Sequence, residues 1–220
     1  MTNVPLPTRV GVLGSGDVGR VLAAGLAHHG IETVLGTRRT DDADLTAWSS
    51  ATGIPIVTFA EATGFGDTVI LAVRGADHAV GGVLDGAGGP EAFAGKVVID
   101  VTNPLVFGEG GPALESTEVS GGEALQLRLP DAQVVKAFNT VGNTLMVDPQ
   151  LPGGPPVMFI AGDDEDAVAR VGAILDAFGW RWLNVGGIER SRELESLCIL
   201  WVAIGSRSGS WSHAFTLLQN

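Results

Sequence analysis

The chain of 220 residues has no tyrosine, one cysteine and two lysines. Without tyrosine it lacks the Tyr–Lys pair that short-chain dehydrogenases use as an acid. The single cysteine, Cys198, excludes an internal disulfide and fits a reducing compartment, so we expect a cytoplasmic protein. The formal net charge of −12 argues against nucleic acid and anionic membranes as partners.

Signals for membranes, targeting and metals are also missing from the sequence. Residues 1–7 have no apolar segment after a basic start, so we expect no signal peptide. The longest apolar run, Leu197–Ile204, is too short to span a bilayer. The sequence has no zinc-ligand spacing and no Ser-His-Asp order, and we predict no metal site and no catalytic side chain. The acidic runs at 41–44 and 163–166 are typical of helix starts, where carboxylates cap free N–H groups.

Glycine is abundant, with 32 residues, and its placement near the N-terminus is informative. Residues 9–19 read RVGVLGSGDVG, which predicts an apolar strand that turns into an amphipathic helix. In such a turn Gly14 permits the tight bend, Gly16 lets the backbone approach a pyrophosphate, and Gly19 allows close helix packing. The positive end of the helix dipole favours the phosphates. The pattern therefore predicts a dinucleotide-binding turn.

The end of the second expected strand indicates which dinucleotide is bound. At this point NAD-binding proteins usually carry an acid that holds the adenosine ribose. Here the chain has Thr37, Arg38 and Arg39. Guanidinium groups suit a 2′-phosphate, so we predict NADP(H) rather than NAD(H). The alternative interpretation is a solvated surface pair.

Strands and helices alternate along the chain, which predicts an α/β fold, a Rossmann-like doubly wound and mainly parallel sheet with a small C-terminal α/β extension. We expect a dinucleotide-binding domain over 1–140 and a C-terminal part over 141–220, packed on it or continuous with it. Loops are expected at 81–90 and 104–122. The expected strands lie near 9–14, 31–36, 54–58, 67–73, 96–101, 132–137, 157–161 and 181–185, and the expected helices near 17–29, 41–51, 59–64, 76–84, 121–128, 163–178 and 189–204.

Ligands of an open α/β sheet lie beyond the carboxyl ends of its strands, which selects the candidate contacts. Two of these residues, and Lys136 beside them, keep a second interpretation. His78 is a cofactor contact or an uninvolved helix residue, and Arg74 is a ligand contact or a surface charge. Lys136, near the same strand ends, forms a buried ion pair or takes part in catalysis. The predicted cofactor contacts are Gly14, Ser15, Gly16, Asp17, Val18, Gly19, Thr37, Arg38, Arg39, Ala72, Val73, Arg74, His78, Asn103, Pro104, Ala137, Phe138 and Asn139.

The last expected helix carries apolar residues at helical spacing, at Leu194, Leu197, Cys198 and Trp201. Core packing is the default interpretation, a dimer interface is the second and a cofactor-binding segment is the third. Because the helix is so apolar, we expect a homodimer. The chain is rich in features that cradle a cofactor and poor in general acids. Hydride exchange between two redox cofactors needs stacking and distance control, whereas reduction of a ketone also needs a proton donor.

With these motifs, the sequence resembles the NADPH-dependent coenzyme F420 reductase family over nearly its whole length. The resemblance rests on GVLGSGDVGRVLA, VLGTRR, VVIDVTNP, VVKAFNT and SRELESL. It implies hydride transfer between NADP(H) and the deazaflavin coenzyme F420. It also implies that Val73, Asn103, Pro104, Ala137 and Asn139 surround the nicotinamide. One departure is the C-terminal FTLL, which has Thr216 where relatives carry lysine.

The GSGD turn and the KAFNT segment are equally similar to the cytosolic domain of six-transmembrane metalloreductases, which passes hydride from NADPH to a flavin. Two alternatives therefore stay open beside the F420 hypothesis. One is an NADPH-dependent reductase of FMN or FAD, and the other is an NADPH-binding sensor module without turnover. A hydroxyacid or imine dehydrogenase is disfavoured because it needs a long helical substrate domain after the sixth strand.

Overall fold

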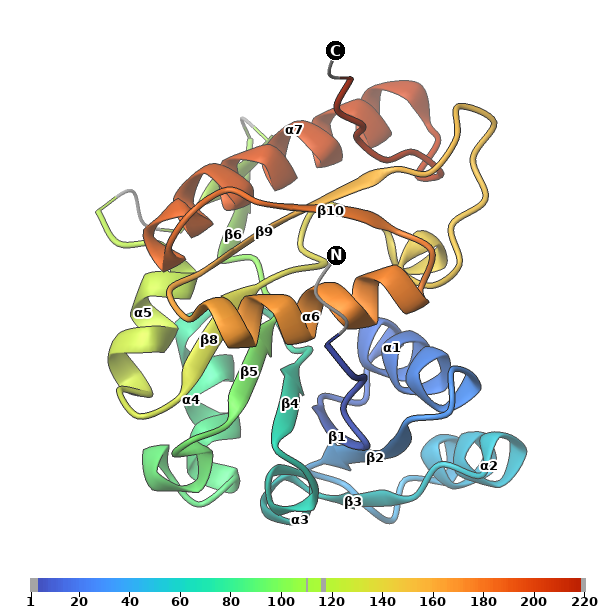
Figure 1. Cartoon of the computed structure of the whole chain (residues 1–220), viewed down its shortest axis with the longest axis vertical. Helices are drawn as coiled ribbons and strands as arrows, with labels where there is room; N and C mark the ends of the chain where they lie inside the picture. The colour runs from blue at the N-terminus through green and yellow to red at the C-terminus, as the bar shows by residue number, and fades with distance from the viewer. Residues whose placement is uncertain (1–3, 110, 116–117, 219–220) are drawn as a thin grey trace.

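The computed structural model describes residues 4–109, 111–115 and 118–218, and it contains an eight-stranded sheet with helices on both faces (Figure 1). The strands are β1 (Arg9–Leu13), β2 (Glu32–Thr37), β3 (Ile56–Thr58), β4 (Thr68–Leu71), β5 (Val97–Asp100), β6 (Leu105–Gly108), β7 (Gly111–Leu114), β8 (Gln133–Lys136), β9 (Val157–Gly162) and β10 (Arg181–Asn184). The α-helices are α1 (Asp17–His28), α2 (Ala43–Thr52), α3 (Phe59–Phe65), α4 (Asp77–Gly86), α5 (Gly121–Arg128), α6 (Glu165–Ala177) and α7 (Ser191–Ser208), with short 3₁₀ turns η1 (Pro90–Phe93), η2 (Asn143–Leu145) and η3 (Ile188–Arg190).

The large sheet has the order β10-β9-β8-β5-β4-β1-β2-β3. Six neighbouring strands of this sheet, β8, β5, β4, β1, β2 and β3, are parallel, which confirms the predicted Rossmann-like, mainly parallel sheet. Strand β9 pairs antiparallel with β8, and β10 pairs parallel with β9. The sheet therefore continues across residue 140 into the C-terminal part.

The core forms two apolar layers, one on each face of this sheet. All residues of β4 and β5 are buried, as expected for strands covered on both faces. Leu22 and Leu26 of α1 pack in one layer together with Ile174 of α6. Val80 of α4 and Leu125 of α5 pack in the other layer. The double burial explains why the central strands read as apolar runs.

Side chains of the chain itself cap most helix starts. The Asp42 side chain accepts hydrogen bonds from two backbone amides of α2, and that of Asp164 accepts one from Ala167. The prediction that the two acidic runs cap helices is confirmed at these two residues. Helices α3 and α5 begin with capping boxes built on Thr58 and Ser120.

Three element predictions were wrong in detail. The loop expected at 81–90 is shorter, because α4 continues to Gly86 and buries Val83 and Leu84 against the sheet. The loop expected at 104–122 contains the β6–β7 hairpin, in which Leu105 pairs with Leu114. The last helix starts after the turn η3 and runs to Ser208.

Helix α7 crosses the end of the sheet where β5 and β8 terminate (Figure 1). Its buried side includes Leu194, Cys198 and Trp201, whereas the outer residues Leu200 and Ile204 are 50% and 38% exposed. The expected apolar helix is therefore buried on one side. Within the described residues, no helix is both long and apolar enough to cross a membrane.

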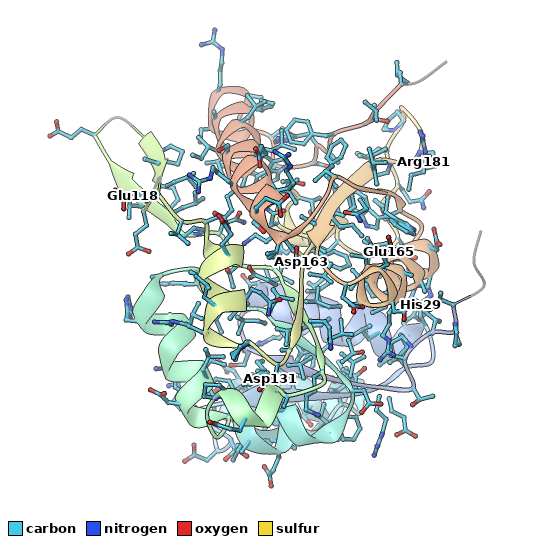
Figure 2. The ribbon with its side chains drawn as sticks, turned by 60° about the vertical axis from the view of Figure 1, so that its left-hand side comes forward. His29, Glu118, Asp131, Asp163, Glu165 and Arg181 are labelled. Carbon is cyan, nitrogen blue, oxygen red and sulfur yellow. The ribbon has the colours of Figure 1, made fainter. Side chains whose placement is uncertain are left out.

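The C-terminal part is tied together around β9. Asp163 follows β9, and its Oδ1 accepts a hydrogen bond of 2.8 Å from the Ile188 amide beneath the start of α7 (Figure 2). After α7 the chain returns to β9, where the Val157 amide donates to the Phe215 carbonyl at 2.9 Å. Trp201 of α7 donates its indole N–H to the His213 carbonyl at 3.0 Å. These bonds fix α7 to the sheet from both of its ends.

Candidate dinucleotide-binding site

The topology places one crevice of the sheet at the carboxyl ends of β1 and β4. The chain leaves β1 through α1 toward β2 on one side, and it leaves β4 through α4 toward β5 on the other side. Such a reversal of strand order opens a crevice that dinucleotides occupy in doubly wound folds. The two loops that line it touch, because a Cβ added at Gly14 would overlap the Ala72 carbonyl.

The structure gives a different geometric reason for glycine at each of the three positions of the β1–α1 turn. Gly14 has a φ of +125°, which side-chain-bearing residues rarely adopt. A Cβ at Gly19 would overlap the Gly14 carbonyl, so the helix can pack this closely only on glycine. A Cβ at Gly16, in contrast, would meet no atom within 4 Å. Gly16 therefore borders open space at the mouth of the crevice.

The start of α1 is available to a ligand. Helices α2, α3, α5 and α6 carry side-chain caps, whereas the N-cap residues of α1 and α4, Gly16 and Ala76, make no side-chain cap hydrogen bond. Helix α7 also begins without one, but it continues from the turn η3. The first amides of an uncapped helix lack partners and attract anions. The two free helix starts flank the β1–β4 crevice.

The end of β2 joins the glycine turn through hydroxyl groups. The Ser15 and Thr37 hydroxyl oxygens are 3.1 Å apart, and the Thr37 hydroxyl accepts a hydrogen bond from the Arg39 amide. Arg20, which is not among the predicted contacts, donates from Nε to the Ser15 carbonyl at 2.9 Å. The turn is thus held in place before any ligand binds.

The two predicted arginines differ in their surroundings. Arg39 is exposed and forms an ion pair of 3.0 Å with Asp42. Arg38 is exposed, and within the described part of the chain it has no ion pair or side-chain hydrogen bond. Arg38 is therefore the freer of the two guanidinium groups for an added phosphate.

The predicted nicotinamide residues follow β4, β5 and β8. Gly75 packs so closely on the Asn103 carbonyl that an added Cβ would overlap it. Asn103 donates to the Asn139 carbonyl at 2.8 Å, and Asn139 donates to Asn103 Oδ1 at 3.0 Å. The two asparagines therefore bridge the ends of β5 and β8. Among the described residues, the buried Oδ1 of Asn139 has no hydrogen-bond partner.

The remaining predicted contacts occupy varied places. Pro104 and Ala137 are buried at the strand ends, Val18 and Val73 are half-buried, and Asp17, Arg74 and His78 are exposed. Phe138 differs from the other predicted contacts in its surroundings. Its side chain is fully buried, with its ring centroid 6.1 Å from that of Phe178, so it packs in the core and leaves only its backbone for a ligand. Its φ of +59° is the bend that carries the chain from β8 toward Asn139.

Lys136 lies in a fully buried ion cluster. Its Nζ is 2.8 Å from Asp100 Oδ2 and 2.7 Å from Glu195 Oε1. Burial alone lowers the pKa of Lys136, but the two carboxylates outweigh it, so the pKa is raised. Of the two interpretations of Lys136, the buried ion pair is confirmed. Glu195 was missed, because only the return of α7 brings it to the strand ends.

Two further features complete the surroundings. Burial, offset in part by the Lys136 charge, raises the pKa of the Cys198 thiol to about 11, so this thiol is unreactive near neutral pH.

A cavity of about 290 Å³ lies between α4 and α5, where Gly75, Pro104 and Gly121 form part of its wall. Within the described residues, no group of three or more His, Cys, Asp or Glu side chains is arranged to hold a metal ion.

Comparison with known proteins agrees with this geometry. Residues 9–104 match the family model described as NADP oxidoreductase, coenzyme F420-dependent. The F420-dependent NADP reductase of Methanothermobacter marburgensis is 28% identical over 215 residues, which cover 91% of this chain and 93% of that protein. A crystal structure from Arthrobacter sp. FB24, provisionally named an F420-dependent NADP reductase, is 31% identical with a TM-score of 0.87, covering 97% of this chain and all of that one.

Two more relatives extend the comparison. Metalloreductase STEAP3 of Rattus norvegicus is 30% identical over 192 residues, and the match covers 86% of this chain but only 36% of that longer protein. The imine reductase of Streptomyces aurantiacus has a TM-score of 0.68 at 20% identity, which shows a shared fold alone.

Proposed function

Because the chain belongs to the family of coenzyme F420-dependent NADP oxidoreductases, we propose that it transfers a hydride between NADP(H) and coenzyme F420. The observation that carries the nucleotide part is the uncapped start of α1 beside open space at Gly16, in the β1–β4 crevice. Free helix amides and a positive dipole end at a topological switch point suit a pyrophosphate. The F420 part rests on the relatives that carry that name.

In this proposal the β1–α1 turn holds the pyrophosphate with the amides of Gly16, Asp17 and Val18. Thr37 and Arg38 hold the 2′-phosphate, and Arg39 contributes less because Asp42 already neutralises it. The nicotinamide lies toward the ends of β4, β5 and β8, near Ala72–Arg74, His78, Asn103–Pro104 and Ala137–Asn139. Residues 1–140 would thus bind the nucleotide, and residues 141–220 would cover the acceptor side.

When bound, NADPH supplies a hydride from its nicotinamide, and the acceptor takes that hydride together with one proton from solvent. The protein residues then have two tasks, to hold the two rings in register and to keep water from the path between them. The Asn103–Asn139 pair holds the strand ends that would carry the nicotinamide. No catalytic side chain is required in this scheme, because the chemistry belongs to the cofactors.

A panel of acceptors tests the proposal. Purified protein is mixed with NADPH and with F420, FMN or FAD, and NADPH oxidation is followed by absorbance. We expect turnover with F420 that exceeds turnover with either flavin. Turnover with flavin alone would support the second candidate, an NADPH-dependent flavin reductase, which the similarity to the metalloreductase favours. NADPH binding without oxidation by any acceptor would support a sensor module instead.

We also propose that the protein is a cytoplasmic homodimer. The outer side of α7 exposes Leu200 and Ile204, and the β6–β7 hairpin exposes 74% of Phe107, so apolar surface is available for a second copy. Cys198 is a buried free thiol, as expected in a reducing compartment. Size-exclusion chromatography with light scattering would test the dimer, and a monomer at micromolar concentration would refute it. Cell fractionation would test the location.

A further inference from the structure

Three charged side chains meet where β5, β8 and α7 come together. Asp100 and Lys136 are fully buried, and Glu195 is 1% exposed. Lys136 Nζ contacts one oxygen of each carboxylate, at 2.8 Å and 2.7 Å. The remaining oxygen of Asp100 accepts a hydrogen bond of 2.9 Å from the Thr102 amide. This ion cluster joins two strand ends to a helix that comes much later in the chain.

Glu195 also controls the start of α5. Its Oε2 accepts from the Gly121 amide at 3.1 Å, and its Oε1 accepts from the Gly122 amide at 3.2 Å. The next amide of α5, that of Glu123, donates to the Ser120 hydroxyl. The first amides of α5 are therefore satisfied by the protein itself, whereas α1 has no side-chain cap hydrogen bond within the described residues. A carboxylate from α7 occupies the place that an anion would take.

The residue beside Glu195 makes a second link to the strand ends. The Leu194 carbonyl accepts a hydrogen bond of 3.0 Å from Asn139 Nδ2. The same Nδ2 donates to Asn103, so two consecutive residues of α7 hold the end of β8 and the start of α5. Gly121 borders the cavity between α4 and α5, and Pro104 lies beside it. The geometry of this side of the site thus depends on one turn of α7.

The composition of the ion cluster favours a role in geometry over a role in stability. Two carboxyl groups and one ammonium group are fully or almost fully buried here, and burying such polar groups costs free energy that apolar residues would not require. Charged hydrogen bonds, however, fix direction and distance more strictly than apolar contacts do. The ion cluster therefore restricts how α7, β8 and α5 are placed relative to one another.

We propose that Glu195 is a positioning residue for hydride transfer: by holding the start of α5 and the end of β8 against α7, it sets how the nicotinamide end of the site faces the acceptor, whereas nucleotide affinity depends mainly on the phosphate contacts. The inference rests on the proposed function, because it presumes a second substrate beside the nicotinamide. The proposed phosphate contacts lie at β1 and β2, on the far side of β4 from the ion cluster. Nucleotide affinity and acceptor turnover should therefore separate on substitution.

The first test is Glu195→Gln, with Glu193→Gln as the matched control on the exposed side of the same helix. Lys136 keeps Asp100 in this variant, so no buried lysine is left unpaired. We expect kcat/KM for the acceptor to fall about 10- to 100-fold, the usual effect of a misplacement near 1 Å, with the Kd for NADPH changed by less than about threefold. The control should match wild type in both. Slow labelling of Cys198 by a thiol reagent shows that the variant is folded.

The second test perturbs the contact between the start of α5 and the start of α7 without changing a charged residue. A Cβ at Gly122 would overlap the Ser191 side chain, whose hydroxyl has no hydrogen-bond partner among the described residues. Gly122→Ala should therefore reduce acceptor turnover, and adding Ser191→Gly should restore it by removing the overlap. If Glu195→Gln does not fold, the comparison of Gly122→Ala with the double variant tests the positioning role instead.

The outcomes separate the two proposals. Acceptor turnover at the wild-type level in folded Glu195→Gln, or equal losses in NADPH affinity and acceptor turnover, would overturn the positioning role while leaving the proposed function intact. Failure of Ser191→Gly to restore turnover in Gly122→Ala would also overturn it. Wild-type protein that oxidises NADPH with none of the acceptors would remove the proposed function and this inference together.

Discussion

Replacing Gly16 by alanine tests whether this position needs glycine for ligand binding or for the stability of the fold. Gly16 has a φ of −73° and a ψ of −178°, which any residue adopts, and an added Cβ would meet no atom within 4 Å. Alanine is a poorer N-cap than glycine, so the free energy of unfolding should fall by no more than about 1 kcal/mol. If a pyrophosphate lies against this backbone, the added methyl group would hold it away.

The loss of binding can be worked from the contacts that the methyl group would block. One charge-assisted hydrogen bond to a phosphate contributes about 1.5–3 kcal/mol, so the Kd for NADPH should rise about 10- to 150-fold. Isothermal titration calorimetry measures the Kd, and urea unfolding measures the stability.

Gly64→Ala is the matched control. Gly64 lies in α3, with no atom within 4 Å of an added Cβ, and it is remote from the crevice. Alanine there should leave the NADPH Kd unchanged and stabilise the helix by about 0.5–1 kcal/mol. An unchanged Kd in Gly16→Ala would refute the assignment of the β1–α1 turn to the pyrophosphate.

Three further predictions follow from the described contacts. Arg38→Ala should weaken NADPH binding by about 1–3 kcal/mol and barely alter NADH binding. Arg39→Ala should weaken NADPH binding less, because Arg39 is paired with Asp42. Equal losses of NADPH and NADH binding in Arg38→Ala would contradict its 2′-phosphate role. Burial raises the pKa of the Cys198 thiol from 9.0 to about 11, so the folded protein holds this proton more tightly than the unfolded chain does. Below pH 9 the difference contributes about 3 kcal/mol to the free energy of unfolding, and this contribution is lost as pH rises through about 11. A Cys198→Ala variant whose free energy of unfolding keeps the wild-type pH dependence would exclude this contribution. A Cβ at Gly172 would overlap the Trp182 indole, so Gly172→Ala should lower the free energy of unfolding by about 1–3 kcal/mol, and an unchanged urea midpoint would count against this packing.

The geometry of the β1–α1 turn was predictable because its determinants are local. The turn at Gly14, the packing at Gly19 and the strand that ends before Arg38 all lie within a short segment, and their spacing follows from the geometry of one βαβ unit. The alternation of apolar and polar segments placed the parallel strands for the same reason.

Prediction failed where packing overrode a local signal. Glycines at 81 and 82 suggested a loop, but the apolar residues around them keep α4 helical against the sheet. At the end of β8, a positive φ turns the Phe138 side chain into the core against Phe178, which the sequence pattern did not indicate.

By itself the sequence determined the parallel sheet, the glycine turn after β1 and the arginine that follows β2, because each depends on residues close together in the chain. Only the tertiary structure decided that Glu195 meets Lys136 and Asp100 and that it satisfies the start of α5. The physical reason is distance along the chain. Sequence spacing predicts which side chains share a strand or a helix face, whereas a contact between β8 and a helix some sixty residues later depends on how the whole sheet is covered.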